Sequence, residues 1–318
     1  MDRNEFRPPA RVTIVAGKGG VGKTTVSATL AYVAARAGVR TLIVEVEGKS
    51  GLPELFGRED ALTYQEAVLL EPGEAGPGSA ELRARTLTPD DALVEYLESH
   101  GLRRVSKRLS STGTLDVVAT AIPGIKDILV LGKVKQLEVL SSSGAEGAPE
   151  FIVVDAPAAG HAVSFLASAY GLLDAASVGP IREQAVQVTA LLADAERCQV
   201  MLVTIPEETP VNEAADTAFH LEDRAGVKLA PIVVNGVWPR LDLDVDSAGD
   251  LSDGRVRAAA EFRLQRQALQ EEQVKRLASL LPLPQLTLPF VFSTELDRRD
   301  LEELADALAP QLAAVVGT

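Results

Sequence analysis

Cysteine, aromatic residues and long hydrophobic runs are all scarce in this sequence. One cysteine, Cys198, and 4% aromatic residues occur among 318 residues. A single cysteine excludes an intrachain disulfide framework and any metal site that needs two cysteines of one chain. No apolar run approaches the ~18 residues of a membrane-spanning helix, and the first residues, MDRNEFRPPARV, lack the apolar region of a signal peptide. We therefore expect a soluble, cytoplasmic protein.

Positive charge is also in short supply. The sequence has 31 Lys and Arg residues against 45 Asp and Glu residues, which gives a formal net charge of −14. Binding along nucleic acid or on an anionic membrane surface needs clustered Lys and Arg, so the charge balance argues against both. The apolar share of 46% is ample for a core and the charged share of 24% is ordinary, so we expect a folded globular chain.

Apolar, β-branched runs alternate with helical patterns along the chain. The first unit is a strand over 11–17 (RVTIVAG), a glycine-rich turn, a helix that ends at Gly38 and a second strand over 40–46. Further strands are predicted at 150–156, 198–205, 229–235 and 285–290, and helices at 161–173, 181–197, 210–225, 256–281 and 295–315. This alternation predicts an α/β fold with a doubly wound, mostly parallel sheet.

Residues 58–149 interrupt that alternation. They contain two flexible tracts, EPGEAGPGSA (71–80) and SSSGAEGAP (141–149), one short strand candidate (ELRARTL), and helices near 89–110 and 124–140. We interpret this stretch as a mostly helical insertion within a single nucleotide-binding domain over 1–318.

The turn after the first strand carries a phosphate-binding pattern. GKGGVGKTT (17–25) fits G-x-x-x-x-G-K-[ST], and the strand before it and the helix after it are the context that this motif requires. The glycines let backbone N–H groups and the helix N-terminus surround an anion. Lys23 would reach the β- and γ-phosphates, Thr24 would bind Mg²⁺ and Thr25 would reach the α-phosphate. The candidate nucleotide-binding residues here are Gly17, Lys18, Gly19, Gly20, Val21, Gly22, Lys23, Thr24 and Thr25.

Lys18 is not required by the phosphate loop itself. The pattern K-G-G-x-G-K-T-T resembles the deviant phosphate-loop family of dimeric ATPases, which includes ParA/MinD partition ATPases, nitrogenase iron protein and ArsA-type anion-pump ATPases. In that family the extra lysine reaches nucleotide phosphates across a face-to-face dimer and neutralises transition-state charge, much as an arginine finger does. The resemblance implies this catalytic role for Lys18; the alternative is a solvated loop lysine.

The next segment narrows the resemblance to the ArsA-type branch. VEVEGKSGLPELFG (44–57) is similar to switch I of ArsA-type ATPases and of the eukaryotic factor that delivers tail-anchored membrane proteins. Residues in register are Glu45, Glu47, Leu52, Glu54, Phe56 and Gly57. The resemblance gives Glu47 the role of positioning the attacking water, although the family has Asp there and Pro-Ala in place of Gly48-Lys49. The alternative is a charged strand end followed by a loop.

Later segments extend the resemblance over most of the chain. IVVDAPAAGH (152–161) resembles switch II, which implies that Asp155 holds the Mg²⁺ water shell. A carboxylate at the end of a buried strand is also energetically costly unless it is paired or lies near a metal. PIVVNGV (231–237) places Asn235 where the family reads the adenine base, and the Asn amide offers one donor and one acceptor for that edge. Pro289 matches the adenine-side loop in part.

Several features of related proteins are missing. Arsenite capture uses several cysteines, the tail-anchor factor uses a C-x-x-C zinc site and a Met-rich groove, and a bridging iron–sulfur cluster needs at least two cysteines per subunit, whereas this chain has one Cys and two Met. Cys198 is expected to be a small buried apolar residue. DLDVDSAGDLSD (242–253) has EF-hand-like carboxylate spacing but lacks the glycine and the final glutamate, so we expect an acidic surface insertion rather than a Ca²⁺ site.

Together these observations predict an ArsA-like, Mg²⁺-dependent ATPase, with ATP and Mg²⁺ as ligands. The resemblance implies a homodimer or a heterodimer with a paralogous subunit, a membrane-protein client, and peripheral contact with the membrane through a partner; no nucleic-acid partner is expected. Two alternatives stay open. One is a ParA/MinD-like ATP-dependent regulator, and the other is an ATP-binding subunit that hydrolyses ATP weakly because Glu47 replaces Asp.

Overall fold

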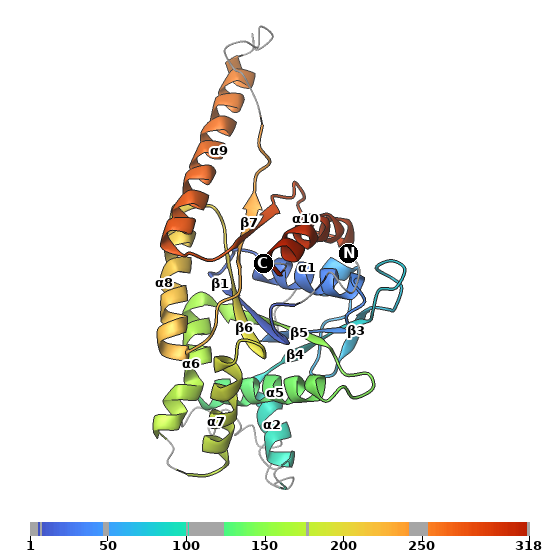
Figure 1. Cartoon of the computed structure of the whole chain (residues 1–318). Coiled ribbons are helices and arrows are strands. Elements are labelled where there is room, and N and C mark those ends of the chain that lie inside the picture. The colour runs from blue at the N-terminus through green and yellow to red at the C-terminus, as the bar shows by residue number, and fades with distance from the viewer. Residues whose placement is uncertain are drawn as a thin grey trace.

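A computed structural model describes residues 6, 8–46, 51–99, 101, 124–175, 178–241 and 254–316. Eight strands form one sheet in the order β3-β4-β2-β5-β1-β6-β7-β8, and every neighbouring pair is parallel except β3–β4 (Figure 1). The strands are β1 (Val12–Gly17), β2 (Thr41–Val46), β3 (Ala67–Leu70), β4 (Leu82–Leu87), β5 (Phe151–Ala158), β6 (Cys198–Thr204), β7 (Ile232–Val237) and β8 (Gln285–Pro289). The predicted doubly wound, mostly parallel α/β sheet is confirmed.

Helices cover both faces of this sheet (Figure 1). They are α1 (Lys23–Arg36), a short 3₁₀ helix η1 (Glu54–Phe56), α2 (Pro89–Ser99), α5 (Ile125–Ser142), α6 (Ala159–Ala175), α7 (Pro180–Ala193), α8 (Glu208–Ala225), α9 (Gly254–Leu280) and α10 (Arg298–Val316). One apolar core lies under α1 and α10, and a second lies under α5, α6, α7 and α8. Helix α9 extends beyond the sheet and the other helices and buries only Gln270 and Leu277.

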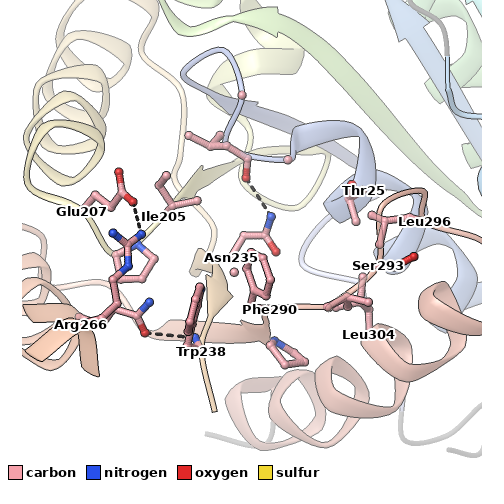
Figure 2. Close-up of a pocket in the computed structure, with 18 residues that line it drawn as sticks. Thr25, Ile205, Glu207, Asn235, Trp238, Arg266, Phe290, Ser293, Leu296 and Leu304 are labelled. Carbon is pink, nitrogen blue, oxygen red and sulfur yellow. Dashed lines mark hydrogen bonds and ion pairs between the residues drawn. The ribbon is translucent and has the colours of Figure 1, made fainter. Parts of the chain in front are cut away.

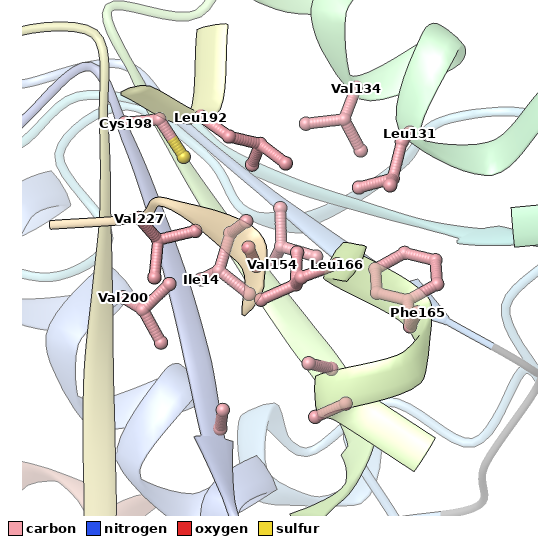
Figure 3. Packing of buried hydrophobic residues seen from close by; sticks show 14 of the residues in the cluster. Ile14, Leu131, Val134, Val154, Phe165, Leu166, Leu192, Cys198, Val200 and Val227 are labelled. Atoms are coloured by element: carbon pink, nitrogen blue, oxygen red, sulfur yellow. The ribbon is translucent and has the colours of Figure 1, made fainter. Parts of the chain in front are cut away.

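Strand side chains alternate between the two cores. In β1, Ile14 faces the core beneath α5 to α8, whereas Val15 faces the core beneath α1 and α10, as the two-residue period of a strand requires. Figure 3 shows the core beneath α5 to α8, where Phe165 packs among residues of several elements. Cys198 belongs to the same core and is 1% exposed, and burial raises the pKa of its thiol to about 12. Cys198 is therefore a buried apolar residue, as expected.

The described part of 58–149 contributes to the main sheet. Strand β4 pairs in parallel with β2, and β3 adds an antiparallel edge. The sequence predicted one strand here, which corresponds to β4; β3 was missed because it is a run of four residues with an exposed first side chain. Helix α2 ends at Ser99, and apart from Gly101 the rest of the helix predicted near 89–110 lies outside the described residues. The division of this stretch into an insertion subdomain stays a prediction.

A buried ion-pair cluster joins α5 to the beginnings of two strands. Glu138 of α5 is 1% exposed, and its carboxylate accepts hydrogen bonds from Arg11 Nε at 2.9 Å and from Arg197 Nη2 at 2.6 Å. Burial raises the pKa of Glu138, but the two guanidinium groups outweigh that effect and hold the pKa below its usual value. The cluster therefore ties α5 to the residues that precede β1 and β6.

Across the described part of the chain, no helix combines the length and the apolar character needed to cross a bilayer.

Candidate nucleotide-binding site

The glycine-rich turn connects the middle of the sheet to α1. Strand β1 lies between β5 and β6 and ends at Gly17, and α1 begins at Lys23. Because all the strands except β3 run parallel, their carboxyl ends share the edge of the sheet from which this loop emerges. In open α/β sheets, ligands bind at this edge, where the strand order reverses.

Two loop glycines are required by close contacts. A Cβ atom on Gly17 would lie 2.4 Å from the Val203 carbonyl oxygen in β6, and one on Gly22 would lie 2.2 Å from Asn235 Nδ2 in β7. Gly22 also has φ of 88°, a left-handed conformation that glycine adopts most readily. Any side chain at either position would push the loop away from its neighbouring strands.

The N-terminus of α1 faces the loop without a competing side chain. Its N-cap residue is Gly22, which has no side chain to accept hydrogen bonds from the first turn, and that turn contains no acidic residue. The first N–H groups of a helix lack partners within the helix and carry partial positive charge. This end of α1 is therefore suited to bind an anion.

Two lysines occupy different positions around the loop. Lys23 is 8% exposed, and its ammonium group donates a hydrogen bond to the Lys18 carbonyl oxygen at 3.1 Å. Lys18 Nζ forms an ion pair with Glu213 Oε1 of α8 at 2.7 Å, with side chains 42% and 40% exposed. Lys23 thus lies across the loop, whereas Lys18 points toward α8.

Oxygen ligands gather beneath the first turn of α1. Thr24 Oγ1 donates a hydrogen bond to Asp155 Oδ2 of β5 at 2.7 Å, and Asp155 is fully buried. A second buried carboxylate, Glu45 of β2, is in register with Asp155 and accepts a hydrogen bond from Thr86 Oγ1 at 2.6 Å. Hydroxyl and carboxylate oxygens are the donors that Mg²⁺ prefers, so Thr24 and Asp155 fit this ion chemically.

A cavity of about 350 Å³ opens beside the loop (Figure 2). Its walls include Gly20, Val21, Gly22 and Thr25, then Ile205, Pro206 and Glu207 after β6, Asn235, Gly236 and Trp238, Arg266 and Gln270 of α9, and Pro289, Phe290, Val291 and Ser293. The volume lies within the range of small-molecule sites. Segments from the two ends of the chain therefore enclose one cavity that begins at the phosphate loop.

Both residues predicted on the base side line this cavity. Asn235 Nδ2 donates a hydrogen bond to the Val21 carbonyl oxygen at 2.9 Å (Figure 2), so this amide also holds the loop against β7. Pro289 ends β8 on the cavity wall. Glu47 lies outside the described residues, together with Gly48, Lys49 and the acidic stretch 242–253.

The sequence did not single out the aromatic and charged side chains on the far wall. Trp238 and Phe290 line the cavity, and Glu207 Oε1 accepts a hydrogen bond from Arg266 Nη2 at 2.7 Å. The one available signal was the position of aromatic residues near the ends of two predicted strands, in VNGVWP and LPFVF. Arg266 had no such signal, because α9 approaches the cavity from a distant segment.

Comparison with known proteins agrees with this geometry. Residues 10–172 match the family described as anion-transporting ATPases, or ArsA ATPases. The chain belongs to this ATPase family. It binds nucleotide and hydrolyses ATP, as its family membership shows. The match favours the ArsA-type interpretation over a ParA/MinD-like regulator.

Three relatives show how far the similarity extends. This ArsA-family ATPase is 30% identical to ATPase BagA of Mycobacterium tuberculosis over 95% of its own length and 93% of that protein. It is 27% identical to an arsenical pump-driving ATPase of Escherichia coli, over 73% of this chain and 40% of the other. It is 30% identical to ATPase get3 of Schizosaccharomyces japonicus, over 48% of this chain and 42% of the other. Similarity to BagA thus covers nearly the whole chain, whereas the others align over parts.

Proposed function

We propose that this chain is an Mg²⁺-dependent ATPase whose nucleotide cycle opens and closes a dimer and so acts on a client or a membrane partner. The observation that carries the proposal is the phosphate loop itself. Lys23 lies over that loop, the Thr24 hydroxyl lies 2.7 Å from the buried Asp155 carboxylate, and a cavity leads from the loop to Asn235 and Pro289.

In this proposal the loop backbone from Gly17 to Gly22 and the Lys23 ammonium bind the phosphates. Thr24 would bind Mg²⁺ directly, and Asp155 would hold water of the metal shell; the metal supplies neutralisation of phosphate charge when bound. Thr25 lies on the cavity wall one residue further along α1, in reach of the α-phosphate by its place in the motif. Asn235 and Pro289 would contact adenine.

Lys18 is proposed to act in the active site of the partner subunit. Its present contact with Glu213 is an ion pair between half-exposed side chains, and pairs of this kind contribute roughly 0–1 kcal/mol. A partner's phosphates carry more charge than one carboxylate, so Lys18 can exchange Glu213 for them at little cost. The partner is an identical chain or a paralogue.

Glu47 is proposed to position the attacking water. Its side chain is one methylene longer than the Asp of the resembling family, which favours slow hydrolysis by the isolated chain and faster hydrolysis with a partner subunit. The weakly hydrolysing subunit of a heterodimer is therefore the second candidate function.

The proposed client is a membrane protein or another protein partner, and contact with the membrane would be through that partner. Names of relatives such as arsenical pump-driving ATPase describe those proteins; one buried cysteine disfavours arsenite as the ligand of this chain. The net charge of −14 supports the absence of a nucleic-acid partner.

Sedimentation of the complex isolated from its native source tests the proposal. With ATP and Mg²⁺ present we expect a particle that contains two ATPase subunits, and mass spectrometry of that particle identifies the partner and the client. Removal of nucleotide should lower the two-subunit fraction. A particle with a single ATPase subunit that turns over MgATP at its full rate would contradict the dimer cycle.

A further inference from the structure

Three aromatic rings form a cluster beside the end of the cavity opposite the phosphate loop, and two of them, Trp238 and Phe290, line that cavity. Trp238 follows β7, and Phe290 and Phe292 follow β8; ring centroids are 5.2 Å apart for Trp238–Phe290, 5.5 Å for Trp238–Phe292 and 4.9 Å for Phe290–Phe292. Phe290 is 38% and Phe292 is 69% exposed. Aromatic side chains this exposed are a costly use of apolar surface unless a ligand or partner covers them.

We infer that Trp238 and Phe290 of this aromatic cluster form the surface on which the nucleobase packs, so that these two rings supply much of the binding energy for the base. The inference rests on the proposed ATP site and deepens it. Because the triphosphate is held at the loop, the base must lie toward the other end of the cavity, where Trp238 and Phe290 form the wall beside Asn235 (Figure 2). Base–aromatic packing is effective for any base, since every base has a π face.

The wall is held in place before a ligand arrives. The backbone N–H of Trp238 donates a hydrogen bond to Gln270 Oε1 of α9 at 3.1 Å, and Gln270 is 5% exposed. On the same helix, the guanidinium carbon of Arg263 lies 4.6 Å from the centroid of the Trp238 ring. A surface ordered in advance loses less conformational entropy on binding, so α9 serves to preorganise the base site.

Asn235 complements the aromatic wall. Its Nδ2 donates a hydrogen bond to the loop at Val21, which fixes the amide plane between the phosphate loop and the base end of the cavity. The rings therefore contribute binding energy that depends little on which base is bound. The second N–H and the carbonyl oxygen of the Asn235 amide can form hydrogen bonds to the edge of the base and so select which base binds.

A ligand without a base separates this inference from the ATP site as a whole. The full chain and its variants are titrated calorimetrically with ATP and with inorganic tripolyphosphate. We expect Phe290→Ala and Trp238→Ala to weaken ATP binding roughly ten- to hundredfold and tripolyphosphate binding less than about twofold. Trp238→Phe should retain ATP affinity within about threefold, because a ring remains. Phe219→Ala removes an aromatic side chain that is 70% exposed on α8 and is the matched control.

Trp238 is the single tryptophan of the chain, so its fluorescence gives an independent readout. ATP should change the emission, and tripolyphosphate should not. Equal losses for both ligands in Phe290→Ala and Trp238→Ala, or no loss for either ligand, would overturn the inference. If the wild-type chain binds neither ligand, the ATP site itself fails, and that result differs from failure of the aromatic wall.

Discussion

Asp155 and Asn235 show how single residues bring distant parts of the chain to the phosphate loop. Asp155 lies on β5, next to β1, and accepts a hydrogen bond from the Thr24 hydroxyl. Asn235 lies on β7, on the other side of β1, and donates a hydrogen bond to the Val21 carbonyl oxygen. Each of these polar side chains follows an apolar run within its strand, which is why the sequence pointed to them. Their contacts with the loop depend on strand order, which no local pattern encodes.

Cys198 gives the first prediction at this scale. Burial raises the pKa of its thiol to about 12, so the side chain stays protonated at neutral pH. A protonated thiol is a poor ligand for arsenite or antimonite, because the thiolate is the form that binds. We expect no saturable arsenite or antimonite binding and no stimulation of ATP hydrolysis by either anion. Calorimetric titration checks this, with Cys198→Ala as control. A tight site that disappears in Cys198→Ala would refute the prediction.

Glu47 gives the second prediction. Compared with Asp, its carboxylate is displaced by about 1 Å, a shift that can cost about a hundredfold in catalytic rate. We expect unchanged ATP affinity but slow turnover by the isolated wild-type chain, faster turnover in Glu47→Asp, and none in Glu47→Gln. Steady-state phosphate release, with nucleotide affinity measured in parallel, is the test. Brisk wild-type turnover that Glu47→Gln leaves unaffected would remove the proposed role.

At the scale of elements, the sequence predicted strands well where they are buried on both faces. Strands β1, β2, β5 and β6 are mostly apolar runs rich in β-branched residues, which is typical of a parallel sheet covered by helices. Strand β3 has four residues and an exposed first side chain, so it lacks that signal. The aromatic cluster was missed for another reason: Trp238 and Phe290 lie on different segments, and only the pairing of β7 with β8 brings them together.

The Glu138 cluster gives a prediction for the contact of α5 with β1 and β6. The pKa of Glu138 is lowered in the folded protein, so its charge stabilises the fold above its unfolded pKa, near 4.5. That contribution is lost as pH falls through the folded pKa. We expect Glu138→Gln to lower the free energy of unfolding at pH 7 by about 2–3 kcal/mol.

Urea unfolding monitored by circular dichroism across pH measures this effect. The difference between wild type and Glu138→Gln should be constant above about pH 6 and shrink below the unfolded pKa of 4.5. Glu261→Gln removes an exposed carboxylate that pairs with Arg257 one turn away and should change stability by less than about 0.5 kcal/mol. A pH-independent difference for Glu138→Gln would contradict the charge-based explanation.

At the scale of the whole molecule, the carboxyl ends of seven parallel strands form one functional edge. The phosphate loop, Asp155, Asn235 and the cavity all lie along it, and α9 extends outward from its far end (Figure 1). The sequence sufficed for the fold class, the phosphate loop and the family. The sequence did not identify the partner or the client, because each is recognised by surface residues that come from many separate elements.

The central claim is that this loop hydrolyses MgATP and that Lys18 acts across a subunit interface. The most direct measurement is steady-state phosphate release by the complex assembled with its native partner, for wild type, Lys23→Ala and Lys18→Ala, beside ATP affinity for each. We predict that hydrolysis requires Mg²⁺ and is lost in both variants, whereas ATP binding is lost in Lys23→Ala and kept in Lys18→Ala; Lys228→Ala, which removes an exposed lysine, should match wild type. Hydrolysis that persists in Lys23→Ala, or that is unaffected by Lys18→Ala, would contradict the account.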